Sequence, residues 1–215
     1  MLQQQKPPLG GWGSVCLTSA YLAPIEYYSA LAKADVVFLE QYDYYLKQTY
    51  RNRCHIAAAN GVMALSIPVE KSTGGKQLTK DVRISAHNDW QIQHWRSIES
   101  AYNSTPFFEY YKDDLQPFYE KKWDFLWDFN WEIQLKILEL LDLDLKIQLT
   151  EQYQPSLNLA VVDLRENIHP KKVTQATETK PYYQVFEQRF GFQPNLSVID
   201  LLFNMGNESQ LIIRN

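Results

Sequence analysis

Positively charged side chains recur at every second position of the segment Tyr50–Ile56, which reads YRNRCHI. If this segment is extended, the alternation of side chains along a strand directs Arg51, Arg53 and His55 to one face. Two guanidinium groups about 7 Å apart on one face suit a phosphate or carboxylate, which each can hold through paired hydrogen bonds. Lys47 adds a positive charge nearby. The same pattern fits the solvated basic face of an edge strand, so an anion site is one of two interpretations.

His94 is a candidate for acid–base chemistry. It falls on the apolar arc of a predicted helix, between Trp90 and Ile98. A histidine that lines a cleft can act as general acid or base near neutral pH. The alternative is a core histidine that is hydrogen-bonded to the backbone. Arg96 and Glu99 are three residues apart on the same helix, a spacing that favours an ion pair on the helix surface.

The segment Val15–Glu40 has the pattern to position such groups, because it reads as strand, loop, helix and strand. Two short runs, Val15–Leu17 and Val36–Leu39, are apolar. Pro24 stands at the expected first position of the helix, where the missing N–H of proline costs no hydrogen bond. The predicted helix runs from Pro24 to Lys33. Two apolar runs joined by a helix indicate a right-handed βαβ unit with parallel strands.

Ligands of such sheets collect beyond the carboxyl ends of the strands. This rule places Thr18, Ser19, Tyr21 and Glu40 at the mouth of a candidate site. Glu40 ends the second strand, where an acidic residue can meet a ribose hydroxyl, a metal ion or a reacting group. An ordinary surface carboxylate is the alternative.

The rest of the chain is predicted from turn and periodicity signals. Asn60-Gly61 indicates a β-hairpin at 51–69 with a type I′ turn, and Pro68 indicates that its second strand lies at a sheet edge or ends there. We expect an α/β fold: a Rossmann-like parallel sheet core that starts with the βαβ unit, a β-hairpin insertion and a helical C-terminal half. We expect one domain over residues 1–215, with a flexible arm at 1–12 and a poorly patterned connection at 150–180. The other expected elements are a strand at 81–85, a helix capped by Asn88 with Gln91 in a capping box, a long helix from Leu115 to Leu143, a strand at 147–150, a short helix at 181–190 ended by Gly191, and a helix capped by Ser197 and ended by Gly206.

Composition narrows the class of protein. The net charge of −4 disfavours a general role in nucleic-acid binding. Cys16 and Cys54 lack metal-ligand spacing, and we expect reduced thiols in a cytoplasmic protein without membrane insertion. The four histidines are scattered, so no metal site is predicted. The common phosphate-loop, dinucleotide, zinc-protease and serine-hydrolase motifs are absent, and the sequence identifies no cofactor.

Several long stretches of the chain resemble the WbqC-like proteins. These stretches are YLAPIEYYSALAKADVVFLEQYDYYLKQTYRNRCHI, the hairpin end LSIPV, HWRSIESAYNSTPFFEYY and the tail LSVIDLLFNMG. Two further stretches, YRNRCHIAAANG and FFEYYKDDLQPFYEKKWDFLWDFN, resemble the branch of the family found in Bacteroidetes-type bacteria. The family's common start is Gln-Pro-x-Tyr-Leu-Pro; Tyr21-Leu22 and Pro24 match it, whereas Ser19-Ala20 replaces Gln-Pro.

The resemblance implies a link to surface-polysaccharide (O-antigen) gene clusters, without an established chemistry. It also adds positions to the candidate site. The matching positions are Tyr21, Pro24, Lys47, Arg51, Asn52, Arg53, His94, Arg96, Glu99 and Asn103.

The leading functional hypothesis is an enzyme of surface-sugar metabolism that transfers a group on a phosphorylated or nucleotide-linked small molecule. In it Arg51, Arg53 and Lys47 hold the anion, Tyr21 and Asn52 orient it, and His94 is the general acid or base, with Glu40 and Glu99 as further catalytic candidates. The rival hypothesis is a non-catalytic interaction protein or homo-oligomer, in which the many Tyr and Trp residues serve a partner. A third is nucleotidylyl transfer, from a likeness of pattern to nucleotidylyltransferases and pantothenate synthetases, whose HxGH signature is missing from this sequence.

Overall fold

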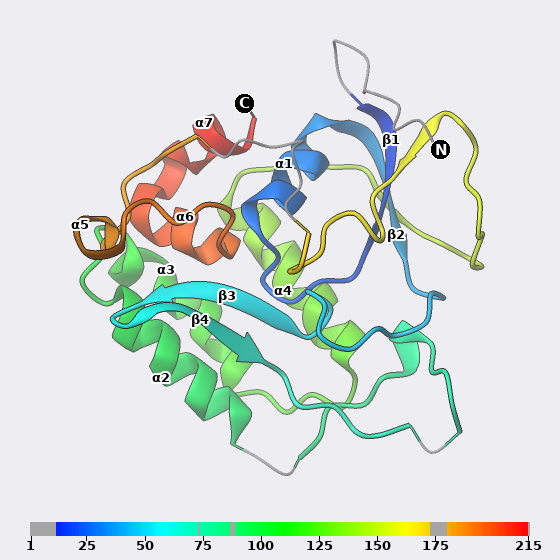
Figure 1. Cartoon of the computed structure of the whole chain (residues 1–215), viewed down its shortest axis with the longest axis horizontal. Coiled ribbons are helices and arrows are strands. Elements are labelled where there is room, and N and C mark those ends of the chain that lie inside the picture. The colour runs from blue at the N-terminus through cyan, green and yellow to red at the C-terminus, as the bar shows by residue number, and fades with distance from the viewer. Residues whose placement is uncertain (1–11, 73, 87–88, 173–179, 215) are drawn as a thin grey trace.

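The protein is an α/β fold built on a parallel four-stranded sheet (Figure 1). The computed structural model describes residues 12–72, 74–86, 89–172 and 180–214. The sheet order is β5-β2-β1-β6, and the strands are β1 (Trp12–Thr18), β2 (Ala34–Glu40), β5 (Ile147–Leu149) and β6 (Val161–Asp163). The predicted parallel sheet is therefore confirmed. The strand at 147–150 is confirmed as β5, whereas β6 lies in the stretch that was expected to be a poorly patterned connection.

The βαβ unit forms as its apolar runs predict. Helix α1 (Ile25–Lys33) joins β1 to β2, and Val15 lies beside Val37 in the parallel register. Pro24 is the residue before the helix, with Glu26 in the first turn and Lys33 in the last, as the helix dipole favours. The unit places the carboxyl ends of β1 and β2, at Thr18 and Glu40, side by side.

The predicted hairpin is confirmed as β3 (Arg53–Ala58) and β4 (Gly61–Ser66), but its turn differs from the expected type I′. The two loop residues are Ala59 and Asn60, and within the turn only Gly61 has a positive φ, of 105°. A type I′ turn needs positive φ at both central residues. The loop is thus a turn that is followed by a glycine with positive φ. Glycine adopts this conformation without a steric penalty because it has no Cβ.

The helices pack around the hairpin and the sheet (Figure 1). Helix α2 runs along β3, and α1, α6 and α7 pack against one another. Aromatic rings fill much of the core, including the fully buried Tyr21, Tyr102, Phe108 and Phe203. The helices are α2 (Trp90–Tyr102), α3 (Phe108–Leu115), α4 (Leu126–Leu140), α5 (Glu187–Phe190), α6 (Val198–Met205) and α7 (Ser209–Ile213), with 3₁₀ turns at 79–81, 116–119 and 206–208.

The predicted single helix from Leu115 to Leu143 is wrong. Helix α3 ends at Leu115, a 3₁₀ turn containing Pro117 follows, and α4 begins only at Leu126. Proline cannot continue an α-helical ladder. The backbone between the helices pairs elsewhere, because the N–H of Leu126 donates to the carbonyl of Val82 over 2.9 Å. Tertiary pairing thus overrides an apolar pattern that is continuous in sequence.

Several local predictions also change. Residues 81–85 form isolated bridges, Val69 with Ile84 and Arg83 with Phe125, rather than a strand. The helix predicted at 181–190 is reduced to the four residues of α5, although Gly191 ends it at a φ of 70°. Gln91 donates to the carbonyls of Phe118 and Lys121 instead of closing a capping box. Asn88 and the arm at residues 1–11 lie outside the described residues.

Candidate functional site

Polar side chains from all four strands meet at the carboxyl edge of the sheet. Thr18 ends β1 and Glu40 ends β2, Thr150 directly follows β5, and Arg165 lies two residues after the end of β6. The loop after β2 adds Asp43, and the turn before β3 adds Arg51. We call this group of residues the sheet-edge network.

One half of the sheet-edge network is the ion pair between Arg51 and Asp43, which are 2% and 5% exposed. Asp43 Oδ2 accepts hydrogen bonds from Arg51 Nη2 and from the Thr18 hydroxyl, the latter over 3.0 Å. Its second oxygen, Oδ1, has no hydrogen-bond partner within the described part of the chain. Arg51 Nε is likewise without an acceptor there. Buried polar groups are nearly always satisfied by protein, water or ligand, so the two open positions on this buried pair mark a place where a further polar group can bind.

The other half is organised by Arg165. Its guanidinium donates to both carboxylate oxygens of Asp163, over 2.9 and 2.6 Å, and lies 3.3 Å from Glu40 Oε2. These hydrogen bonds with Asp163 raise the pKa of Arg165. Glu40 Oε1 accepts from Thr150 Oγ1 over 2.8 Å and from the backbone N–H of Tyr42 over 2.7 Å. Glu40 is therefore a buried member of this network rather than an ordinary surface carboxylate.

Chain connectivity joins the two halves, because Glu166 follows Arg165 and its Oε1 lies 3.4 Å from Arg51 Nη2. The backbone of Arg51 is held as well: Asn130 Nδ2 donates to its carbonyl over 2.8 Å and to the Ser19 hydroxyl over 3.0 Å. The thiol of Cys16 lies beneath the network, and burial raises its pKa to about 12. A cysteine in this state is a thiol at neutral pH and not a nucleophile.

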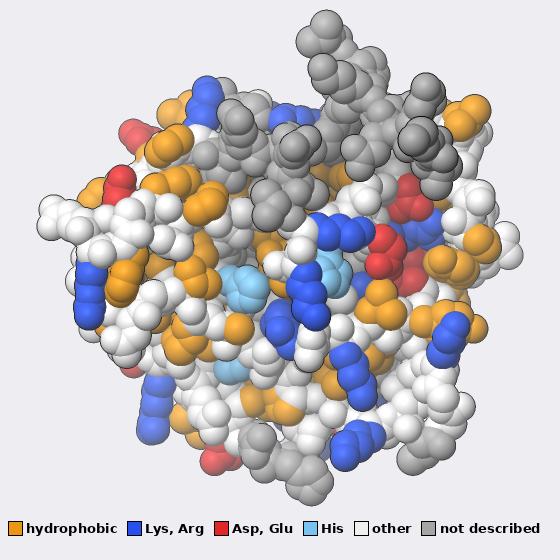
Figure 2. All heavy atoms as spheres, in the orientation of Figure 1, with side chains coloured by type: hydrophobic (Ala, Val, Ile, Leu, Met, Phe, Trp, Pro, Cys, Tyr) orange, Lys and Arg blue, Asp and Glu red, His pale blue; other side chains and the backbone are white. Residues whose placement is uncertain are grey.

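Basic side chains lie around the network. Arg53 is half-buried, and its Nε has no described hydrogen-bond partner. Burial lowers the pKa of His169, and the nearby charges of Lys172, Lys171 and Arg51 lower it further, against an opposing effect from Glu166. Figure 2 shows the face of the molecule on which the hairpin lies in front. Lys, Arg and His side chains gather in the middle of this face, with acidic side chains beside them. The surroundings of the network are thus suited to an anionic ligand.

The arginine pair differs from the sequence expectation. Strand β3 begins at Arg53, so Arg51 lies in the preceding turn and does not share the face of Arg53 and His55. Arg53 and His55 lie on one face of the hairpin, as alternation predicts, and burial, with a smaller effect from Arg53, lowers the pKa of His55. Both arginines affect the same phenol: burial raises the pKa of Tyr45 to about 12, and Arg53 and Arg51 act against that rise. The two guanidiniums therefore remain near each other, although Arg51 is already paired.

The structure places His94 in the aromatic core. Its Nδ1 lies 2.9 Å from the Tyr21 hydroxyl, which is also 2.9 Å from the hydroxyl of Tyr119. Burial lowers the pKa of His94 to about 4, against a smaller opposing effect from the backbone of Ser66. None of its described hydrogen bonds reaches Arg51 or Arg53. A catalytic role for His94 and a ligand-orienting role for Tyr21 stay predictions, and the contacts favour a structural role for both.

The remaining sequence candidates are dispersed. Asn52 is buried and donates to the carbonyl of Ile67 over 2.8 Å, which ties the loop to the end of β4. Pro24 is buried at the start of α1, and Lys47 is exposed. Arg96, Glu99 and Asn103 are exposed along α2, and the expected Arg96–Glu99 ion pair is not among the described salt bridges.

Sequence reasoning missed Asp43, Thr150, Asp163, Arg165 and Glu166. A usable signal existed for Thr150 and Arg165, since each follows an apolar run and the strand-end rule applies to both. Asp43 carried no local signal, because its importance arises from its contacts with Arg51 and Thr18 in the folded chain.

The fold and site together define an α/β protein with a charged, partly unsatisfied network at the carboxyl edge of a parallel sheet. The chain belongs to the WbqC-like protein family, whose profile matches residues 19–185. It is similar to the uncharacterized protein Rv1507c of Mycobacterium tuberculosis, with 23% identity over 91% of this chain and 95% of that protein. No solved structure matches the chain. No helix in the described ranges is both long and apolar enough to cross a bilayer.

Proposed function

We propose that this chain is a group-transfer enzyme that binds a phosphorylated or nucleotide-linked small molecule over the sheet-edge network. The observation that carries the proposal is the buried Arg51–Asp43 pair with its two open hydrogen-bonding positions. The family's association with surface-polysaccharide genes supports a sugar derivative as the substrate.

The anionic part of the ligand is assigned to the basic groups around the network. Arg53 offers an Nε–H without a described acceptor, and His169 and Lys172 lie on the segment that follows β6. Guanidinium groups hold phosphate through paired hydrogen bonds, and a lysine adds a point charge. The guanidinium of Arg51 adds to the positive electrostatic potential of these groups, although Asp43 and Glu166 balance much of its charge.

The hydroxyl-bearing part is assigned to Asp43. Arg51 and Thr18 fix one carboxylate oxygen, so the other is oriented; because it is shielded from solvent, it can accept a hydrogen bond from a ligand hydroxyl that enters the network or from a water molecule that bridges to the ligand. A carboxylate held in this way is suited to orient an acceptor hydroxyl for transfer. The proposal therefore moves the central acidic role from Glu40 and Glu99 to Asp43.

A thermal-shift screen tests the proposal, with UDP-glucose, UDP and glucose 1-phosphate as probes. We expect at least one probe to raise the melting temperature of the native protein. Arg53→Ala and Asp43→Asn are expected to remove most of that rise, whereas Lys122→Ala, which deletes a charge at a side chain that is 85% exposed, keeps it. An unchanged rise in both site variants contradicts the proposal. A melting temperature that depends on protein concentration and on no probe instead supports the rival interaction protein.

A further inference from the structure

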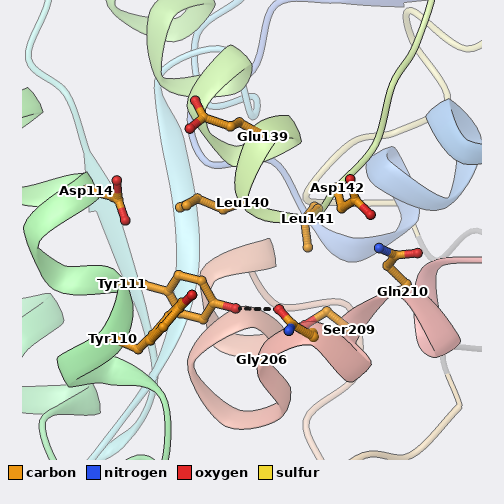
Figure 3. Close-up of a pocket in the computed structure, with 11 residues that line it drawn as sticks. Tyr110, Tyr111, Asp114, Glu139, Leu140, Leu141, Asp142, Gly206, Ser209 and Gln210 are labelled. Atoms are coloured by element: carbon orange, nitrogen blue, oxygen red, sulfur yellow. Dashed lines mark hydrogen bonds between the residues drawn. The ribbon is translucent and has the colours of Figure 1, made fainter.

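A second candidate site lies away from the sheet edge, in a cavity of about 490 Å³. Its walls come from α3, from the C-terminal end of α4 and from residues 206–210 (Figure 3). The volume falls in the range of pockets that hold small molecules. None of its lining residues belongs to the sheet-edge network.

Two tyrosines form an aromatic corner of this cavity. The rings of Tyr110 and Tyr111 have centroids 4.7 Å apart and planes at 85° to each other. Tyr111 is anchored, because its hydroxyl donates to Asn207 Oδ1 over 3.2 Å. Tyr110 is 72% exposed, so its ring is free of core packing. The two rings pack edge to face, and aromatic rings set at right angles to each other are an element of the cages by which proteins surround ammonium groups.

The charged lining has the complementary sign. Three carboxylates, Asp114, Glu139 and Asp142, line the cavity, and no Lys or Arg is among its described lining residues. Lys136 lies 2.8 Å from Glu139 Oε2 and 3.7 Å from Asp114 Oδ1, so it offsets part of this charge. No described ion pair balances Asp142. A concave surface lined by one sign of charge concentrates ligands of the opposite sign.

We propose that this cavity binds a small organic ammonium ion, with the charged group against the Tyr110–Tyr111 corner and the carboxylates around it. A metal ion is a poorer occupant, because in the described ranges no three acidic, histidine or cysteine side chains are grouped closely enough to hold one. Leu140 and Leu141 supply an apolar surface for the carbon body of the ligand. This proposal does not depend on the function assigned to the sheet edge.

Calorimetric titration of the full chain tests this directly, with choline and its uncharged carbon isostere 3,3-dimethyl-1-butanol as a matched pair. We expect saturable binding of choline that weakens as salt is added, and no comparable binding of the isostere. Equal binding of the two compounds overturns the proposal, because the charge then contributes nothing. Binding of calcium chloride without binding of choline also overturns it.

Two variants locate the site. Tyr110→Leu and Asp142→Asn change exposed side chains, so we expect both to fold, and each is expected to weaken choline binding by about threefold or more. Asp144→Asn is the control, since it removes an exposed acidic charge two residues away that does not line the cavity. Loss of choline binding in the control alone, or in none of the three variants, places the ligand elsewhere and refutes the assignment.

Discussion

Asp43 and Arg51 form a buried ion pair at the carboxyl edge of the sheet, and each keeps one polar atom without a described partner. They are eight positions apart in the chain. The pair connects the loop after β2 with the turn before β3, so it supports both the fold and the proposed site.

The first prediction concerns the stability of this pair. Arg51→Met leaves Asp43 buried and uncompensated, and we expect a loss of about 3–5 kcal/mol in the free energy of unfolding. The double variant Asp43→Asn/Arg51→Met removes both charges and is expected to lose less than the two single variants combined. Urea unfolding of the four proteins measures the coupling. Strictly additive losses would show that the two side chains do not act as a pair.

The second prediction concerns pH. Burial lowers the pKa of His94 from 6.5 in a model peptide to about 4 in the folded protein. The neutral imidazole therefore contributes its full stabilisation above pH 6.5, and this contribution, about 3 kcal/mol, is lost as the pH falls toward 4. We expect wild-type stability to decline more steeply than that of His94→Asn between pH 7 and pH 4.5. An NMR titration that gives His94 an ordinary pKa near 6.5 contradicts this account.

The third prediction concerns Gly206, which follows α6. Its φ is 55°, and a Cβ added there would lie 2.6 Å from the ring of Phe107. We expect Gly206→Ala to lower the free energy of unfolding by about 1–3 kcal/mol, from backbone strain and overpacking together. Gly74→Ala is the control, because nothing lies within 4 Å of its added Cβ. Equal melting temperatures for the two variants would count against the close contact.

The fourth prediction separates the two arginines. Arg53 is half-buried and has an open Nε–H, so Arg53→Lys is expected to fold normally and to bind the sheet-edge ligand about tenfold more weakly. Titration of the best probe against native protein and Arg53→Lys gives this ratio, with Lys122→Ala as the charge control. An unchanged affinity in Arg53→Lys removes Arg53 from the site.

The parts of the fold that could be predicted are those encoded locally. Two apolar runs, a proline and a terminal glutamate predict the βαβ unit. The glycine of the turn predicts the hairpin. Pro117 is a local signal for the end of α3, whereas the late start of α4 was hidden, because it depends on the pairing of Leu126 with Val82, residues far apart in the chain. Strand β6 was hidden for the same reason: three residues become a strand only where Val162 lies beside Val15.

The site was predictable in location but not in composition. The strand-end rule pointed to Thr18 and Glu40, both of which join the sheet-edge network. The alternation argument assumed a strand from Arg51 onward, whereas β3 begins two residues later, and Arg51 turns toward Asp43. Likewise, the apolar arc around His94 was visible, but its hydrogen bond to Tyr21 requires the folded chain.

Hydrogen exchange with and without the best phosphorylated probe tests the central claim most directly, because it reports where the ligand binds. The account predicts slower amide exchange in residues 40–53 and 163–172, with little change in residues 108–115 and 206–210. Protection confined to those last two segments, or absent from the sheet edge for every probe that binds, would contradict it.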